Sequence, residues 1–298
     1  MNNAGLPLID DIAVIRLAGP DAEAFAQAQT MNDVAALPVG HWHWNGWLTP
    51  KGRVQALFAL ARVAPGDLLV LLLDHPAEAF RDALQRFVFR SKVRITVESG
   101  LGLRGEWPGD ASPDGASKQP EARAESATFL RRPDGTLGLD FSATSGPRFG
   151  WIAARGDAGP DADASARWRD EDLRHGLPRF GAGREHGWTP HMLSLDRLKA
   201  FSVRKGCYPG QEIVARTHYL GQSKRQAWWL DGAGLAAGLA VADLEGRPVG
   251  EVVEASADGR GALAVAALPG PGEVKSGEGI AMACAPREGL ARPIEEKL

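Results

Sequence analysis

The chain has 298 residues, of which 44% are hydrophobic and 24% are charged, and its formal net charge is −3. This composition allows a packed core of about two domains and disfavours global disorder. The near-neutral charge argues against binding to nucleic acid or to a membrane surface through overall charge. We expect no membrane span, because no apolar run approaches ~18 residues, and no secretion signal is visible at the N-terminus. Two cysteines cannot form a disulfide framework, which favours a reducing cytoplasm.

The N-terminal third alternates strands with short helices. Strands are predicted at residues 12–17, 41–44, 53–63, 68–73 and 92–97, and helices at 22–29 and 76–87. The side chain of Asp21 is expected to cap the first helix. Residues 49–52 predict a tight turn that joins two strands into a hairpin. This order of elements is typical of an α+β protein rather than of strict βαβ repetition.

The remaining chain changes character twice. Residues 107–125 lack periodicity and are rich in Gly, Pro and Ser, which predicts a flexible loop. Short strands follow over residues 129–151, and a helix is predicted over residues 161–175, ended by Gly176. From residue 225 onward, short apolar runs alternate with Gly-rich turns, the pattern of a small antiparallel β-barrel or sandwich.

One run stands apart from this pattern: KGCYPGQE at residues 205–212, which contains one of only two cysteines. Lys205 and the N-terminus of the helix expected after the Pro-Gly turn would both stabilise the thiolate form of Cys207. Gly206 and Gly210 allow the backbone to approach a ligand or another chain segment closely. The run predicts a functional loop centred on Cys207. An equally weighted alternative is a tight turn that holds an inert, buried cysteine.

Other candidate sites are weaker. The sequence contains no P-loop, H-E-x-x-H or G-x-S-x-G pattern. His41 and His43 share a strand face, but no third ligand is spaced to complete a metal site, so a solvated or hydrogen-bonded pair is the preferred interpretation. Basic residues gather around the Cys207 run, where they fit a solvated surface or a site for an anionic ligand.

The run 205–212, continued by Arg216 and Thr217, resembles the signature of the YgfZ family, folate-binding proteins that maintain iron–sulfur clusters. Further matches lie at residues 19–22, 29–33, 48–53, 89–93, 173–178 and 189–193. Together they cover most of the chain outside residues 107–165.

The resemblance implies the fold of the glycine cleavage T-protein, an α+β body that binds tetrahydrofolate near its centre, followed by a small antiparallel C-terminal β-barrel. We therefore expect an N-terminal α+β folate-binding domain over residues 1–100 and a middle α+β segment over 101–170. Residues 171–223 would return to the folate-binding body and carry the Cys207 loop, and residues 224–298 would form the barrel.

The resemblance also implies a function, that of a cytoplasmic tetrahydrofolate-binding accessory protein for iron–sulfur cluster assembly or repair. Its clients would include tRNA-modifying enzymes. Cys207 would be the functional thiol, with Lys205 as its supporting charge. The residues expected to shape the loop are Gly206, Tyr208, Gly210, Gln211, Glu212 and Arg216, and those expected to contact folate are Trp44, Arg53, Asp172 and Arg174. The expected partners are folate and iron–sulfur client enzymes or assembly proteins. No resident metal, stable nucleic-acid complex or membrane contact is expected, and the chain is expected to act as a monomer.

Two positions depart from the T-protein pattern. Where that protein carries adjacent aspartates, one of them catalytic, an ungapped alignment on the hairpin turn places Ala56 and Leu57. Where it has a folate-contacting Glu, this chain has Arg174, and Asp172 or Glu171 are the carboxylates that could substitute. A folate-dependent aminomethyl or one-carbon transferase is thus a second hypothesis, weakened by the missing carboxylates. An RNA-binding module is the third and weakest.

Overall fold

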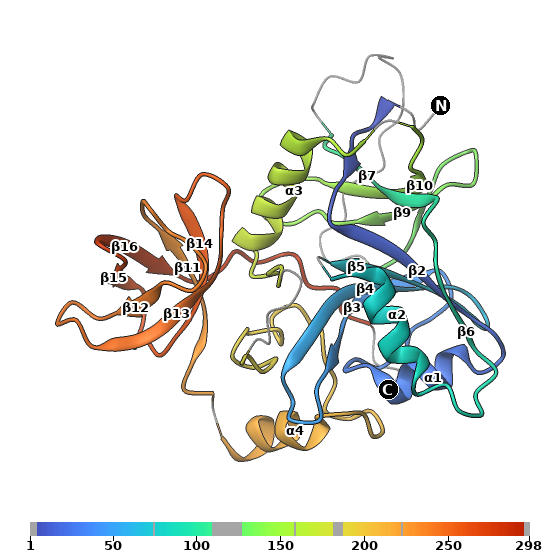
Figure 1. Cartoon of the computed structure of the whole chain (residues 1–298), viewed down its shortest axis with the longest axis horizontal. Coiled ribbons are helices and arrows are strands. Elements are labelled where there is room, and N and C mark those ends of the chain that lie inside the picture. The colour runs from blue at the N-terminus through green and yellow to red at the C-terminus, as the bar shows by residue number, and fades with distance from the viewer. Residues whose placement is uncertain are drawn as a thin grey trace.

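The computed structural model describes residues 5–73, 75–108, 127–157, 159–180, 187–221 and 223–294. These residues form two five-stranded sheets, four helices and a closed six-stranded barrel (Figure 1). The barrel lies at one side of the molecule, and the helix α3 lies between it and the two sheets of the body. The predicted α+β body with a C-terminal antiparallel barrel is confirmed.

The first sheet is antiparallel and buried on both faces. Its strands, in spatial order, are β3 (His41–Leu48), β4 (Val54–Ala64), β5 (Asp67–Leu73), β2 (Ile12–Ala18) and β6 (Arg94–Val97). One face packs against the helices α1 (Ala22–Gln29) and α2 (Ala77–Gln85). The other face joins the central core of the body. Burial on both faces explains why β5 is an almost continuous apolar run.

The second sheet carries the helix that faces the barrel. Its spatial order is β1 (Leu8–Ile9), β7 (Leu101–Glu106), β10 (Phe149–Ala154), β9 (Leu137–Asp140) and β8 (Leu130–Arg131). The helix α3 (Ala162–Arg174) begins at Asp161, whose carboxylate accepts a hydrogen bond from the Ala164 amide at 2.9 Å. It ends before Gly176, which has a φ of +78°. This helix was predicted correctly, including both of its ends.

The start of α1 differs from its prediction. Asp21 makes no side-chain cap for this helix. Its Oδ2 instead accepts a hydrogen bond from the Lys92 amide at 2.6 Å, which fastens the segment before β6 to the start of the helix. A local pattern could not show this, because the two residues lie 71 positions apart in the chain.

The barrel closes in the order β11 (Gln226–Asp231), β14 (Gly261–Ala266), β13 (Pro248–Ala255), β12 (Ala240–Ala242), β15 (Gly272–Ser276) and β16 (Gly279–Cys284). Beyond β16 the chain returns to the body. The Trp44 indole N–H donates to the Leu290 carbonyl at 2.7 Å, and the buried Arg292 guanidinium donates to the Asp140 carbonyl at 2.9 Å. The C-terminal residues therefore hold the barrel onto the body.

The predicted flexible loop at 107–125 lies, from residue 109 onward, outside the described residues. Trp107, which that prediction included, packs edge-on against Trp168 with ring centroids 5.7 Å apart. Through the described ranges, no helix combines the length and the apolar character that a membrane crossing requires.

Candidate functional site

The KGCYPGQE run leads into the helix α4 (Gln211–Leu220), which contains its last two residues, and rests on the hairpin turn between β3 and β4. Gly210 begins the helix with a φ of +82°. A Cβ at this residue would lie 2.6 Å from the Thr49 carbonyl oxygen and 2.7 Å from the Gly52 Cα. A Cβ at Gly206 would meet nothing within 4 Å. The close approach predicted for the glycines thus belongs to Gly210, and its partner is another segment of the same chain.

Cys207 is exposed and its thiol is free. The alternative of an inert, buried cysteine is therefore wrong. The following backbone holds the exposed thiol in place, because Gly210 and the start of α4 are docked on the hairpin turn. A partner molecule can reach the sulfur without any opening of the body.

Lys205 corrects the expectation that its charge supports the thiol. The residue is only 5% exposed, and its Nζ donates hydrogen bonds to the carbonyls of Gln27, Thr30 and Asn32, at and just beyond the C-terminus of α1. An ammonium has three N–H donors, so all of them are used here. Burial lowers the pKa of Lys205 to about 7, with the Asp33 carboxylate acting in the opposite direction. The lysine fixes the loop to α1 and directs no donor at Cys207.

Asn32, which accepts a hydrogen bond from Lys205, belongs to a buried network of polar side chains. The Asn32 amide group donates to the carbonyls of Trp44 at 2.8 Å and Lys199 at 2.7 Å. His43 is fully buried beside Asn45, 3.2 Å from its side-chain nitrogen, and burial lowers the pKa of His43 to about 3. His43 is therefore a neutral core residue. Among the described residues there is no group of three or more potential ligands that could hold a metal ion.

The other residues of the run separate into buried and exposed members. Tyr208 is buried, its ring lies 4.8 Å from Lys205 Nζ, and its hydroxyl reaches the Ser202 carbonyl at 3.4 Å. Burial raises the pKa of the Tyr208 hydroxyl, which stays protonated. Glu212 and Arg216 form an exposed ion pair at 3.1 Å along α4. Such a pair contributes little stability, so both side chains are available to a partner.

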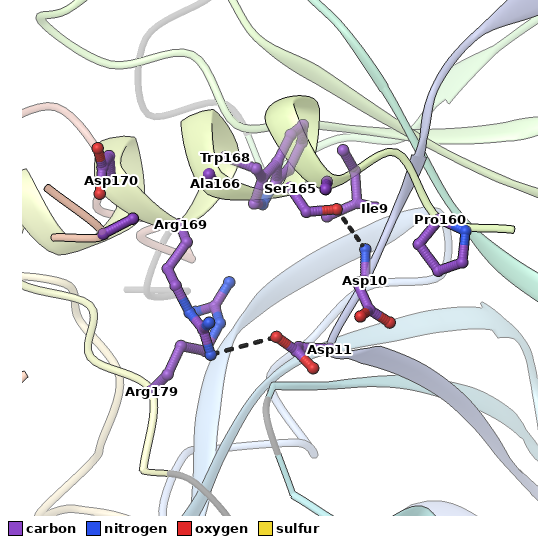
Figure 2. A pocket seen from close by; sticks show the side chains of 12 residues that line it. Ile9, Asp10, Asp11, Pro160, Ser165, Ala166, Trp168, Arg169, Asp170 and Arg179 are labelled. Carbon is purple, nitrogen blue, oxygen red and sulfur yellow. Dashed lines mark hydrogen bonds and ion pairs between the residues drawn. The ribbon is translucent and has the colours of Figure 1, made fainter.

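A cavity of about 340 Å³ lies beside α3, and we call it the α3 cavity (Figure 2). Its volume falls within the range of small-molecule sites. Charged residues on its wall are Asp10, Asp11, Arg169, Asp170 and Arg179, and apolar ones include Ile9, Pro160 and Trp168. Arg169 pairs with Asp11 at 3.2 Å. Burial, followed by the nearby Asp258, raises the pKa of Asp170.

Two residues that line the α3 cavity each have a buried hydrogen-bond donor without an acceptor. Arg179 donates through Nη2 to Asp172 at 2.5 Å, yet its Nη1 has no partner in the described part of the chain. The indole Nε1 of Trp168 is likewise buried and without a partner there. Buried donors are nearly always satisfied in folded proteins. Both atoms are buried behind the wall of the cavity, whose exposed polar groups are the charged side chains named above.

The four residues expected to contact folate are not gathered in one place. Trp44 is packed against Trp42 and Phe141 and bonded to Leu290, so neither ring face is open. Arg53 donates to the Gly187 carbonyl at 2.5 Å. Arg174 lies over the Trp229 ring at 4.9 Å.

Asp172, the fourth, is bonded through both carboxylate oxygens to Arg148 and Arg179. It is the one member of the set that is connected to the α3 cavity, through Arg179. No local pattern indicated Arg179, Asp10 or Asp11, because they line the cavity together although they lie far apart in the chain. Contact of folate with any of the four residues stays a prediction.

The positions that correspond to the T-protein aspartates are occupied by buried apolar side chains. Ala56 and Leu57 lie on β4 and are buried. No carboxylate stands at either position to stabilise a developing positive charge.

Several known proteins are similar to this chain in sequence. No protein-family model matches the chain. It is 28% identical over 255 residues to the tRNA-modifying protein YgfZ of Edwardsiella ictaluri, covering 80% of this chain and 74% of that protein. It is 29% identical over 261 residues to the tRNA-modifying protein YgfZ of an Enterobacter species, covering 82% and 78%.

A solved structure, the glycine cleavage system aminomethyltransferase T of Bartonella henselae, superposes with a TM-score of 0.67. The superposition covers 96% of this chain and 85% of that one, at 17% sequence identity. The predicted fold is thereby confirmed. The resemblance to the YgfZ family, predicted from the run around Cys207, is confirmed over most of the chain. The fold of the chain is that of aminomethyltransferase T.

Proposed function

We propose that this protein is a cytoplasmic, tetrahydrofolate-binding accessory protein that supports iron–sulfur enzymes, including enzymes that modify tRNA. The observation that carries the proposal is the exposed thiol of Cys207 on a loop docked on the hairpin turn. The names of the similar YgfZ proteins support the link to tRNA modification. Their similarity covers more than two thirds of both chains.

The α3 cavity fits part of a folate and is the site we assign to it. Pterin and glutamate groups carry both N–H donors and acceptor oxygens. On the cavity wall, Asp10 and Asp170 offer carboxylates to ring N–H groups, and the guanidinium of Arg179 and the indole of Trp168 lie beside them. When bound, the folate would supply a carrier for one-carbon units. The chain's own residues would bind it and exclude water.

Cys207 would act on the client rather than on the folate. Thiolate-ligated iron–sulfur clusters need four cysteines, and one exposed thiol supplies at most one ligand. The remaining ligands would come from the client, so contact would be transient. The loop that presents the sulfur is already fixed by Lys205 and Gly210, so little ordering is required when the client docks. Action as a monomer is part of this proposal.

A transferase activity has no comparable support. Ala56 and Leu57 place apolar side chains where the T-protein pattern has carboxylates. An aminomethyl transfer would lack the charged group that the chemistry needs.

The first experiment measures tetrahydrofolate binding by calorimetry with three variants. Cys207→Ser should bind like wild type, because the thiol is not among the residues that line the α3 cavity. Trp168→Phe removes the indole N–H and part of the ring from that wall and should weaken binding by at least about 5-fold. Cys284→Ser is the matched cysteine control and should also bind normally.

The same variants should then replace the native protein in cells whose iron–sulfur tRNA-modifying enzymes are assayed. We expect Cys207→Ser to lose client activity and Cys284→Ser to retain it. Full activity of Cys207→Ser would refute the thiol role. Absence of tetrahydrofolate binding to the wild-type protein would refute the folate role.

A further inference from the structure

A second surface, outside the Cys207 loop and the α3 cavity, carries an unusual concentration of cations and aromatic rings. We call it the basic-aromatic strip; it consists of Arg86, Phe87, Phe89, Arg90, Lys92 and Arg94, all of them exposed. It runs from the end of α2 into the edge strand β6 (Figure 1).

The strip carries four cations and no carboxylate of its own, although the Asp21 carboxylate lies against the Lys92 amide. No Asp or Glu occurs between residues 83 and 97, whereas the whole chain has a net charge of −3. Among the described residues, none of its four cations forms an ion pair, in contrast to the neighbouring Arg81, which pairs with Asp82 at 2.7 Å. Four unpaired charges side by side repel one another, and a polyanion would relieve that repulsion.

Three cations of the strip follow one another at alternate positions. Exposure alternates along the chain, with Arg90, Lys92 and Arg94 exposed and Ser91, Val93 and Ile95 partly or fully buried. Arg90 lies in a bend and Arg94 begins the edge strand β6. The result is a row of positive charges along one edge of the sheet.

The backbone beneath this row is held firmly. The Lys92 amide donates to Asp21 Oδ2 at 2.6 Å, and the Asp21 amide donates to the Lys92 carbonyl at 3.4 Å. Val88 and Val93 pack against the core under α1 and α2. The row is therefore formed before any partner arrives, which lowers the entropic cost of binding.

Two phenylalanines distinguish the strip from an ordinary charged edge. Lysines and arginines on an edge strand prevent pairing with other sheets, which would account for Lys92 and Arg94 alone. Phe89 is 86% exposed and Phe87 is 48% exposed, and the guanidinium of Arg90 lies 5.5 Å from the centre of the Phe89 ring. Exposed rings among unpaired cations are the arrangement on which unpaired bases stack while phosphates are neutralised.

An anionic membrane fits this surface less well. Binding to a membrane surface relies on an amphipathic helix whose apolar face enters the lipid. The apolar face of the adjacent helix α2, formed by Phe80 and Leu84, is buried in the core. Only the two rings remain outside.

We infer that the basic-aromatic strip binds single-stranded nucleic acid, with phosphates along Arg90, Lys92 and Arg94 and a base stacked on Phe89. Binding is weak because the protein as a whole carries a net negative charge. It falls as salt rises because each phosphate contact releases counterions. The inference goes beyond the proposed function, and it stands or falls independently of Cys207 and the α3 cavity.

The test is fluorescence anisotropy of the full chain with labelled 12-nucleotide oligouridylate and oligothymidylate, over a range of salt concentrations. Phe89→Ala should weaken binding about 10-fold, as the loss of one stacked base does. The double variant Arg90→Gln/Lys92→Gln should weaken it further and reduce the slope against log salt by about 1.4, two single-strand phosphate contacts. Ile280→Ala and Lys275→Gln, exposed on the barrel, are the matched controls and should bind like wild type.

Equal binding by both oligonucleotides would show that the site recognises single strands with either sugar. A preference for oligouridylate would assign the site to RNA. Unchanged binding in Phe89→Ala and in the double variant would overturn the inference. So would binding to vesicles with 30% phosphatidylserine that the same variants abolish while oligonucleotides fail to bind. Cys207→Ser should bind as wild type, which separates this result from that of the proposed function.

Discussion

At the scale of single residues, Lys205 shows how a functional motif can contain a structural member. Its ammonium lies at the C-terminal end of α1, where carbonyls without helical partners and the negative end of the helix dipole favour a cation. The lysine reaches across 173 to 178 positions of sequence to do so. The Cys207 loop is thereby attached to the N-terminal sheet.

Replacement of this lysine by methionine should destabilise the protein by about 2–4 kcal/mol. Methionine keeps most of the buried apolar stem, but it leaves three carbonyls without their shared donor, and a buried acceptor without a partner costs about 1–3 kcal/mol. Urea unfolding of Lys205→Met against wild type measures the difference. Lys224→Met, at an exposed position, should change the free energy of unfolding by less than about 0.5 kcal/mol. A Lys205→Met variant as stable as wild type would mean that the ammonium does not stabilise the carbonyls.

At the scale of elements, the contact between the start of α4 and the β3–β4 hairpin turn places Cys207. Gly210 and Gly52 both have positive φ and meet one another there, and a Cβ at Gly52 would lie 2.8 Å from the Cβ of Ile213. Two turns that were separately identifiable in the sequence therefore form one joint in the fold.

The two glycines of the run offer a matched pair of substitutions. Gly210→Ala should cost at least about 2 kcal/mol, because alanine at positive φ is strained and its Cβ would overlap the Thr49 carbonyl. Gly206→Ala has open space around it and should change the stability by less than about 0.5 kcal/mol. Thermal unfolding of both variants checks the difference. Equal melting temperatures would show that the turn can move away from α4 at no cost.

Local sequence patterns predicted many of the helices and strands, but few of the contacts between segments that are distant in the chain. The apolar runs of β2, β4 and β5, the extent of α3 and the helix after the Pro-Gly turn were all predicted, because each depends on neighbouring residues. The strand β7, with the sequence LGLRGE, has no alternation and was missed. The partners of Lys205 and the burial of Arg179 were also out of reach, since both depend on tertiary contacts between distant segments.

At the scale of the whole molecule, Asp172 joins the parts of the protein through buried charges. Its two oxygens accept from Arg148, which precedes β10, at 2.6 Å and from Arg179 at 2.5 Å. The Arg179 amide in turn donates at 2.5 Å to Glu254 of the barrel strand β13. One carboxylate on α3 thus connects the second sheet, the α3 cavity and the barrel.

Removing that carboxylate should be far more damaging than removing an exposed one. Asp172→Asn leaves two buried guanidiniums without a counter-charge and should cost about 3–5 kcal/mol. Glu212→Gln, which breaks the exposed pair with Arg216, should cost less than about 1 kcal/mol. Chemical denaturation of the two variants provides the comparison.

Replacing Arg148, Asp172 and Arg179 together tests whether these buried charges stabilise the protein or only compensate one another. The triple variant Arg148→Met/Asp172→Leu/Arg179→Met removes every member and should recover much of the stability that Asp172→Asn loses, since no buried charge is left uncompensated. It should also weaken the folate binding proposed for the α3 cavity, because Arg179 is lost from its wall. If the triple variant is no more stable than Asp172→Asn, the ion pairs themselves hold the second sheet and the barrel on α3.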